Sequence, residues 1–187
     1  MESYFRRVFS EILDKIEDID IKEKTVKTWV MAAEEGNWTK AEELENMPFT
    51  LLTDCHGINL IEHTIAVTKG AEGLAKAIIG TYDAPFTIDF NFLFAGGLLH
   101  DVGKLLEFEL VDGKYQKSLY GRCARHPISG AILTSKAGLP LEIVNIVACH
   151  AKEGDGRPQR IETIMIHQAD FATFDPMVML KAGTLIV

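Results

Sequence analysis

The stretch FLFAGGLLHDVGK, residues 92–104, places an imidazole and a carboxylate, His100 and Asp101, at the end of an otherwise apolar run. An apolar run of this length belongs in a protein core. A buried charge is costly unless hydrogen bonds, an ion partner or a metal compensates it. The rest of the chain must therefore supply the groups that compensate the burial of His100 and Asp101.

The chain has 187 residues, of which 47% are hydrophobic and 25% are charged, as in ordinary globular proteins. This length suits one domain with a real core. The net charge of −8 argues against duplex DNA or a membrane surface as the main partner, because both require a broad basic surface. The sequence shows neither a membrane-spanning stretch nor a signal peptide, so we expect a cytoplasmic protein.

Apolar periodicity predicts helices nearly throughout the chain. We expect Asp89 to cap a helix that runs through HDVGK, and Asp112-Gly113 to form the turn of a loop or small hairpin. The other expected helices cover residues 4–19, 21–35, 60–79, 126–136 and 140–150, and a last one runs from 162 to beyond 174; residues 39–46 are expected to form a short helix or a turn. The prediction is an all-α helical bundle, with residues 1–50 as an extension packed on a single unit of residues 51–187.

Five of the expected helices carry a histidine or an aspartate toward their apolar side. Taken alone, each histidine is explained by a hydrogen bond to a carbonyl, and each aspartate by a helix cap or an ion pair. The repetition on five helices favours another explanation, which is that the side chains converge on a divalent metal. The residues are His63, His100, Asp101, His126, His150 and Asp170.

The three cysteines are an odd number without a CxxC pair, so we expect no disulfide framework. They are explained as small buried residues of helices. A thiolate ligand remains a minor alternative, because Cys55, Cys123 and Cys149 each lie within three residues of a histidine.

The order of these residues resembles that of the HD superfamily of metal-dependent phosphohydrolases. The segment GGLLHDVGK, residues 96–104, is similar to the core signature of that superfamily, and the likeness extends over residues 53–175. It implies a helical bundle around a metal site. Further segments that carry it are HGINLIEHT (56–64), RHPISGAIL (125–133), IVACHAKEG (146–154) and IHQADFATFD (166–175).

Among the branches of the superfamily, the chain most resembles the HD domain of bacterial 3′-to-5′ exoribonucleases. It departs from that branch because Ala151 stands where a second histidine usually follows the one at 150. It also lacks an OB-type nucleic-acid domain. The segment LYGRCARHP, residues 119–127, differs from the GYP signature of cyclic-di-GMP phosphodiesterases.

The resemblance implies a site for one or two divalent ions (Mn, Fe, Co, Ni, Zn or Mg), with Asp101 bridging. One ion would be held by His63, His100, Asp101 and Asp170, and the other by His126, His150 and Asp101. Two ions about 3.5–4 Å apart share a hydroxide and clamp a phosphoryl oxygen. The implied activity is cleavage of a phosphomonoester or phosphodiester bond of a nucleotide, dinucleotide or short oligonucleotide by metal-bound hydroxide.

Several cations accompany these residues. Lys104 is expected to act as a catalytic clamp on the phosphate; the alternative is a surface lysine paired with Glu107. Arg122, Arg125 and Arg157, with Arg160, either bind further phosphates or are simply solvated. His56 would line the substrate pocket and His167 would support the ligands; the alternative for both is an ordinary core or surface residue.

Two other functions remain open from the sequence. One is a mixed-valent di-iron oxygenase, which is found in a minority of HD-type enzymes. The other is a non-catalytic regulatory module, although such modules typically lose the dyad or the final aspartate, and this chain keeps both. We further expect residues 1–50 to cover the bundle or form a homodimer contact, and the apolar tail 177–187 to pack on something.

Overall fold

The structure is a computed structural model that describes residues 1–186. Its helices confirm the expected all-α class, and a two-stranded hairpin is the one sheet within those residues. The helices are α1 (Glu2–Val8), α2 (Ser10–Leu13), α3 (Ile19–Glu35), α4 (Ala41–Glu45), α5 (Leu60–Thr81), α6 (Phe90–Leu99), α7 (Lys104–Glu107), α8 (Leu119–Cys123), α9 (His126–Ala137), α10 (Leu141–Cys149), the 3-10 turn η1 (Lys152–Gly154) and α11 (Ile161–Ala182), with strands β1 (Phe108–Val111) and β2 (Lys114–Lys117).

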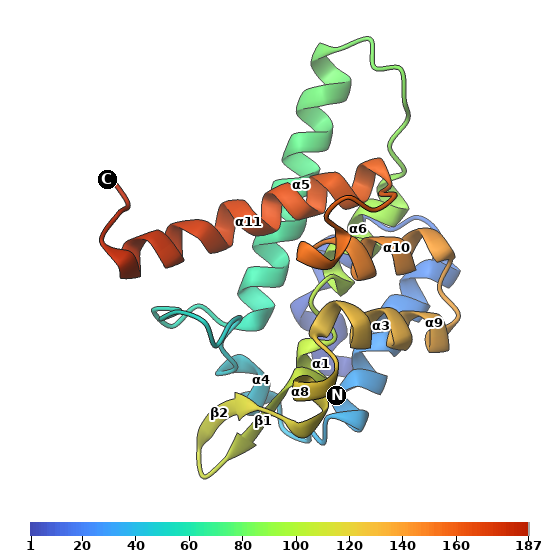
Figure 1. Cartoon of the computed structure of the whole chain (residues 1–187). Coiled ribbons are helices and arrows are strands. Elements are labelled where there is room, and N and C mark those ends of the chain that lie inside the picture. The colour runs from blue at the N-terminus through green and yellow to red at the C-terminus, as the bar shows by residue number, and fades with distance from the viewer. Residues whose placement is uncertain (187) are drawn as a thin grey trace.

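Helix α6 lies at the centre and packs against α3, α5, α10 and α11 (Figure 1). Every residue from Leu93 to Leu99 is buried. Two glycines allow the close packing: a Cβ on Gly97 would lie 2.7 Å from the Thr68 hydroxyl on α5, and one on Gly96 would lie 2.6 Å from Ile146 on α10. The neighbouring helices therefore approach the backbone of α6 directly, which brings their polar residues to its C-terminal end.

The expected helix through HDVGK is wrong in one respect, because α6 ends at Leu99. Asp89 does cap its start and accepts hydrogen bonds from the backbone N–H groups of Asn91 and Phe92. Residues 100–103 form a turn, and α7 begins only at Lys104. The ligand dyad is therefore presented by a turn in the core rather than by a helix face.

Gly103 allows this turn to pack against the start of α9. A Cβ at this position would lie 2.1 Å from the carbonyl oxygen of His126 and 2.6 Å from the hydroxyl of Ser129. We predict that Gly103→Ala lowers the free energy of unfolding by about 1–3 kcal/mol or more, because the backbone must move to relieve the clash. Chemical denaturation measures this loss.

The control for that substitution is Gly73→Ala on α5, where a Cβ would meet nothing within 4 Å. It is expected to leave the stability equal or to raise it by up to about 1 kcal/mol, since alanine is the better helix former. If Gly103→Ala proved as stable as the wild type, the close packing of the turn on α9 would be contradicted.

The N-terminal helices cover one side of α6. The expected single helix 4–19 is instead split into α1 and α2 at Phe9. Phe9 and Phe5 pack on Trp29 with ring centroids 5.1 and 5.3 Å away, and the indole N–H of Trp29 donates to the carbonyl of Leu98 on α6. We propose on this basis that residues 1–50 act as a layer over the bundle, and a boundary at residue 50 remains a prediction.

Helix α11 crosses α5 and its C-terminal half extends away from the body (Figure 1). The apolar tail is largely exposed: Val178, Met179, Leu180 and Ile186 have 39 to 96% of their surface accessible. Met177 packs against the core, packing of the exposed part of the tail on a neighbouring chain stays a prediction, and Val187 lies outside the described residues. Among the helices of residues 1–186, none has the length and hydropathy required to cross a membrane.

Candidate metal centre

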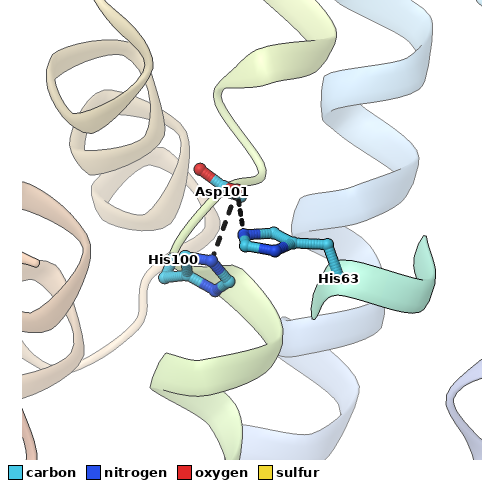
Figure 2. A group of neighbouring side chains, drawn as sticks. All are labelled: His63, His100 and Asp101. Atoms are coloured by element: carbon cyan, nitrogen blue, oxygen red, sulfur yellow. Dashed lines mark ion pairs between the residues drawn. The ribbon is translucent and has the colours of Figure 1, made fainter. Parts of the chain in front are cut away.

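Four imidazoles surround the carboxylate of Asp101. Its Oδ2 lies 3.2 Å from Nε2 of His63 and 3.3 Å from Nε2 of His100 (Figure 2). Its Oδ1 lies 3.3 Å from Nε2 of His126 and 3.8 Å from Nε2 of His150. Each carboxylate oxygen thus faces its own pair of histidines, as a carboxylate that bridges two ions would.

The side chains form two ligand groups that share Asp101. The first set is His63, His100 and Asp101, and the second set is Asp101, His126 and His150. Within each set the ligand atoms lie within 4.8 Å of one another. Asp170 on α11 joins the first set through His63, with its Oδ1 3.1 Å from Nε2. The structure therefore brings together all six residues that the sequence singled out as ligands.

The tautomers of these histidines favour a metal. His100 and His150 each direct Nδ1 at a backbone carbonyl, of Gly97 at 2.7 Å and of Val147 at 2.8 Å. A carbonyl only accepts, so Nδ1 carries the proton and Nε2 presents a lone pair. Nε2 of His100 and of His150 is buried, and neither finds a hydrogen-bond partner within residues 1–186. Two orphaned lone pairs beside a carboxylate fit a divalent cation.

His126 is held by Glu107, which the sequence suggested only as a possible partner of Lys104. The carboxylate Oε2 of Glu107 accepts hydrogen bonds from the backbone N–H of His126 at 2.6 Å and from its Nδ1 at 2.8 Å. Phe49 was also missed, and its ring stacks on that of His63 with centroids 4.5 Å apart. Glu107 and Phe49 are both far in sequence from the histidines that they contact, so no local sequence pattern predicts these contacts.

Charge in the centre is balanced between acids and imidazoles. Burial raises the pKa of Asp101, but Lys104 and the neighbouring histidines outweigh it and hold that pKa well below its usual range. Burial likewise opposes ionisation of Asp170, yet its hydrogen bond with His63 lowers its pKa to about 2. Burial lowers the pKa of His126 to about 4. At neutral pH the site therefore holds ionised acids and a neutral His126, the forms that bind a cation.

Lys104 is buried rather than a surface residue. Its ammonium donates to the backbone carbonyl of Phe49 at 2.6 Å and to Oδ2 of Asp101 at 2.5 Å. Pairing with Glu107, the alternative considered from the sequence, is not what the structure shows. Because an ammonium has three N–H groups, one donor remains for a ligand in the cavity that Lys104 lines.

A cavity of about 390 Å³ opens beside the metal ligands. It is bordered by aromatic rings and by cations, and His63, His126 and Asp170 form part of its wall. Arg125 lies there and pairs with Glu153 at 2.6 Å. The aromatic residues are Phe49, Phe108, Phe171 and Phe174, and the cations are Lys104, Lys117, Arg125 and Lys152.

Three residues expected to bind substrate lie elsewhere. His56 is exposed on the wall of a different hollow, because the Asn59 side chain caps α5 and leaves His56 in the preceding loop. Arg122 is exposed on α8, whose Gly121 packs on Glu107. Arg157 is exposed in the loop after η1. His56, Arg122 and Arg157 thus lie outside the lining of the cavity beside the metal ligands, contrary to the place that we expected for them.

The remaining candidates have structural contacts. His167 directs Nδ1 at the carbonyl of His150 at 2.6 Å, so it supports the backbone of a ligand. Arg160 pairs with Glu162 at 3.0 Å. The thiol of Cys55 donates to the carbonyl of Thr50, and its burial raises the pKa. Neither ligand set includes a cysteine in the described part of the chain.

Proton release should accompany metal binding. Burial disfavours a charged His63, but hydrogen bonds to Asp101 and Asp170 outweigh it and raise the pKa of His63. A metal must displace that proton, so we predict that affinity for Mn²⁺ rises with pH as His63 loses its proton. Calorimetric titrations in two buffers of different ionisation enthalpy measure the protons released. Equal affinity at pH 6 and pH 8 would contradict the prediction, and His56→Gln, outside the centre, should keep the wild-type profile.

Known proteins resemble this chain over the same region. The family model described as HD domain matches residues 60–172. The dihydroneopterin 2′,3′-cyclic phosphate phosphodiesterase of Methanocaldococcus jannaschii is 34% identical over 115 residues, covering 60% of this chain and 45% of that protein. Ribonuclease Y of Desulforamulus reducens and of Acetivibrio thermocellus are each 31% identical over 115 residues, covering 62% of this chain and 18% of theirs.

The chain thus spans less than half the length of these relatives. No solved structure was found to match it. The particular likeness to 3′-to-5′ exoribonucleases stays a prediction.

Proposed function

The chain belongs to the HD domain family, and from that premise we propose that it is a metal-dependent phosphohydrolase acting on a small nucleotide-like phosphodiester or phosphomonoester. One observation carries the proposal. The two oxygens of Asp101 face two separate pairs of buried histidines, at 3.2 to 3.8 Å. Such an arrangement suits two divalent ions that share one carboxylate.

His63, His100, Asp101 and Asp170 would hold one ion, and Asp101, His126 and His150 the other. A bound divalent ion lowers the pKa of coordinated water and polarises phosphoryl oxygens. Imidazole and carboxylate ligands suit Mn, Fe, Co, Ni or Zn, and Mg would use mainly the carboxylates.

The cations of the cavity would bind and orient the phosphate. Lys104 offers its remaining N–H beside Asp101, and Arg125 offers a planar pair of donors once it leaves Glu153. Lys117 and Lys152 add positive charge to the wall. A local cationic pocket in a chain of net charge −8 selects small anions rather than long nucleic acids.

The aromatic walls favour a substrate with a planar ring. Phe108, Phe171 and Phe174 line the cavity near the phosphate-binding cations, and flat rings bind heterocycles by stacking. The relatives support phosphodiester cleavage, because one is named a cyclic phosphate phosphodiesterase and others a ribonuclease.

The test is hydrolysis with each divalent ion in turn. We expect Mn²⁺, Co²⁺ or another of the ions named above to support cleavage of bis-p-nitrophenyl phosphate or a 2′,3′-cyclic nucleotide, and a chelator to abolish it. Arg122→Ala, which alters an exposed arginine outside the cavity, should retain the rate. A folded sample that cleaves no phosphodiester, phosphomonoester or oligonucleotide end with any of these ions would reject the proposal.

A further inference from the structure

The carboxylate of Glu107 is held between a ligand histidine and the β-hairpin. Its Oε2 accepts both hydrogen bonds from His126, and its Oε1 lies 3.2 Å from the ammonium of Lys117 on β2. The side chain of Glu107 is 7% exposed, whereas that of Lys117 is 45% exposed. One acid therefore joins the interior of the metal centre to a solvent-facing strand.

Several elements of the fold hold Glu107 in this position. Glu107 is the last residue of α7, and Lys117 pairs across the hairpin with the next residue, Phe108, which brings the Lys117 ammonium beside Glu107. The backbone N–H of Ser118 donates to the carbonyl of Glu107 at 2.9 Å. Gly121 on α8 packs against it so closely that a Cβ there would lie 2.8 Å from Cγ of Glu107. The carboxylate has little freedom to leave His126.

The two ligand sets differ in charge, and Glu107 offsets the difference. The first set has two carboxylates within reach, Asp101 and Asp170, but the second set has only its share of Asp101. Glu107 supplies a second acid to that side through Nδ1 of His126. An imidazole that donates to a carboxylate is a more basic ligand than one that donates to a neutral carbonyl, as His150 does.

We propose that Glu107 is a positioning residue that strengthens metal binding at the second set, and that the ammonium of Lys117 keeps the carboxylate of Glu107 against His126. The inference rests on the proposed metal centre but not on any substrate.

Titration of the metal-free full chain with Co²⁺ tests the proposal, with stoichiometry and dissociation constants as the readout. Glu107→Gln keeps the shape but removes the charge, and it should weaken binding of one ion about 10–100-fold while the other is unchanged. The affected ion is identified by comparison with two reference variants. The profile should match that of His126→Ala, which removes a ligand of the second set, and differ from that of Asp170→Asn, which removes one of the first.

The matched control is Glu109→Gln on β1, which removes the same charge from the hairpin at a residue that hydrogen-bonds Gln116. It should bind both ions as the wild type does. Combining Glu107→Gln with His126→Ala should cost no more at the second set than His126→Ala alone, because the two act through one contact. Equal weakening of both ions, or no weakening in a folded Glu107→Gln protein, would overturn the proposal.

Lys117→Met keeps the test decisive if Glu107→Gln fails to fold, because Lys117 is half-exposed and its loss should be tolerated. Lys117→Met should weaken binding of the ion at the second set by a few-fold. The control, Lys114→Met on the same strand, should leave binding unchanged. Identical titrations for the two variants would contradict the role of Lys117. These titrations contain no substrate. If the protein hydrolysed no phosphoester but Glu107→Gln still weakened metal binding, the proposed function alone would fail. If hydrolysis occurred but Glu107→Gln left metal binding unchanged, the role of Glu107 alone would fail.

Discussion

Asp101→Asn is expected to abolish metal binding at both ligand sets and to reduce hydrolysis on the order of 10³-fold or more, which corresponds to about 4 kcal/mol of transition-state stabilisation. The substitution removes the one charge that the two sets share. It also places an NH₂ group where one pair of histidines requires an oxygen, since each oxygen of Asp101 faces a different pair. Elemental analysis of the purified variant, together with its rate of phosphodiester cleavage, measures both losses.

Asp170→Asn provides the comparison for that variant. Asp170 lies 3.1 Å from His63 of the first set, so its loss should weaken binding of one ion and spare the other. Circular dichroism must show both variants folded, because Asp101→Asn also leaves the ammonium of Lys104 buried without its anion. An Asp101→Asn protein that binds the wild-type number of ions would contradict the shared-ligand arrangement.

Lys104→Met is expected to lower kcat about 10²–10³-fold while metal affinity stays equal or rises. Methionine fills the space of the lysine stem but offers no N–H to a phosphate. It also removes the cation that lies 2.5 Å from Oδ2 of Asp101, where it competes with an incoming metal ion for the carboxylate. The opposite directions of kcat and affinity separate a phosphate clamp from a structural lysine.

Stability gives the third readout for Lys104. Loss of the hydrogen bond to the carbonyl of Phe49 leaves that buried acceptor unpaired, which costs about 1–3 kcal/mol. Lys114→Met, on the exposed hairpin strand, is the control and should match the wild type in rate and stability. A Lys104→Met enzyme within about twofold of the wild-type kcat would remove Lys104 from the catalytic machinery.

Most of the metal centre could be predicted from the sequence because its ligands interrupt apolar patterns. His63 and His126 lie in helices, where a polar residue on a buried face is conspicuous. His100 and His150 instead follow the last residues of α6 and α10. Helix periodicity extends past those ends, so it does not reveal the turn at residues 100–103.

The residues around the ligands could not be predicted in the same way. Glu107 meets His126 across a hairpin and a short helix, and the pairing depends on the register of β1 with β2 rather than on spacing. Phe49 reaches His63 from a segment before α5 that carries no regular pattern. His56 was expected to line the pocket, but the cap by Asn59 starts α5 at Leu60, as predicted, and leaves His56 in the loop before the helix.

We propose that two sets of side chains sharing Asp101 hold divalent ions, and anomalous diffraction from a crystal grown with Mn²⁺ would locate those ions. We expect anomalous peaks between Asp101 and its histidines, with one ion near His63, His100 and Asp170 and the other near His126 and His150, at ligand distances of about 2.0–2.3 Å. A well-ordered crystal of the same fold that shows no anomalous peak within reach of Asp101, at saturating Mn²⁺, would contradict it.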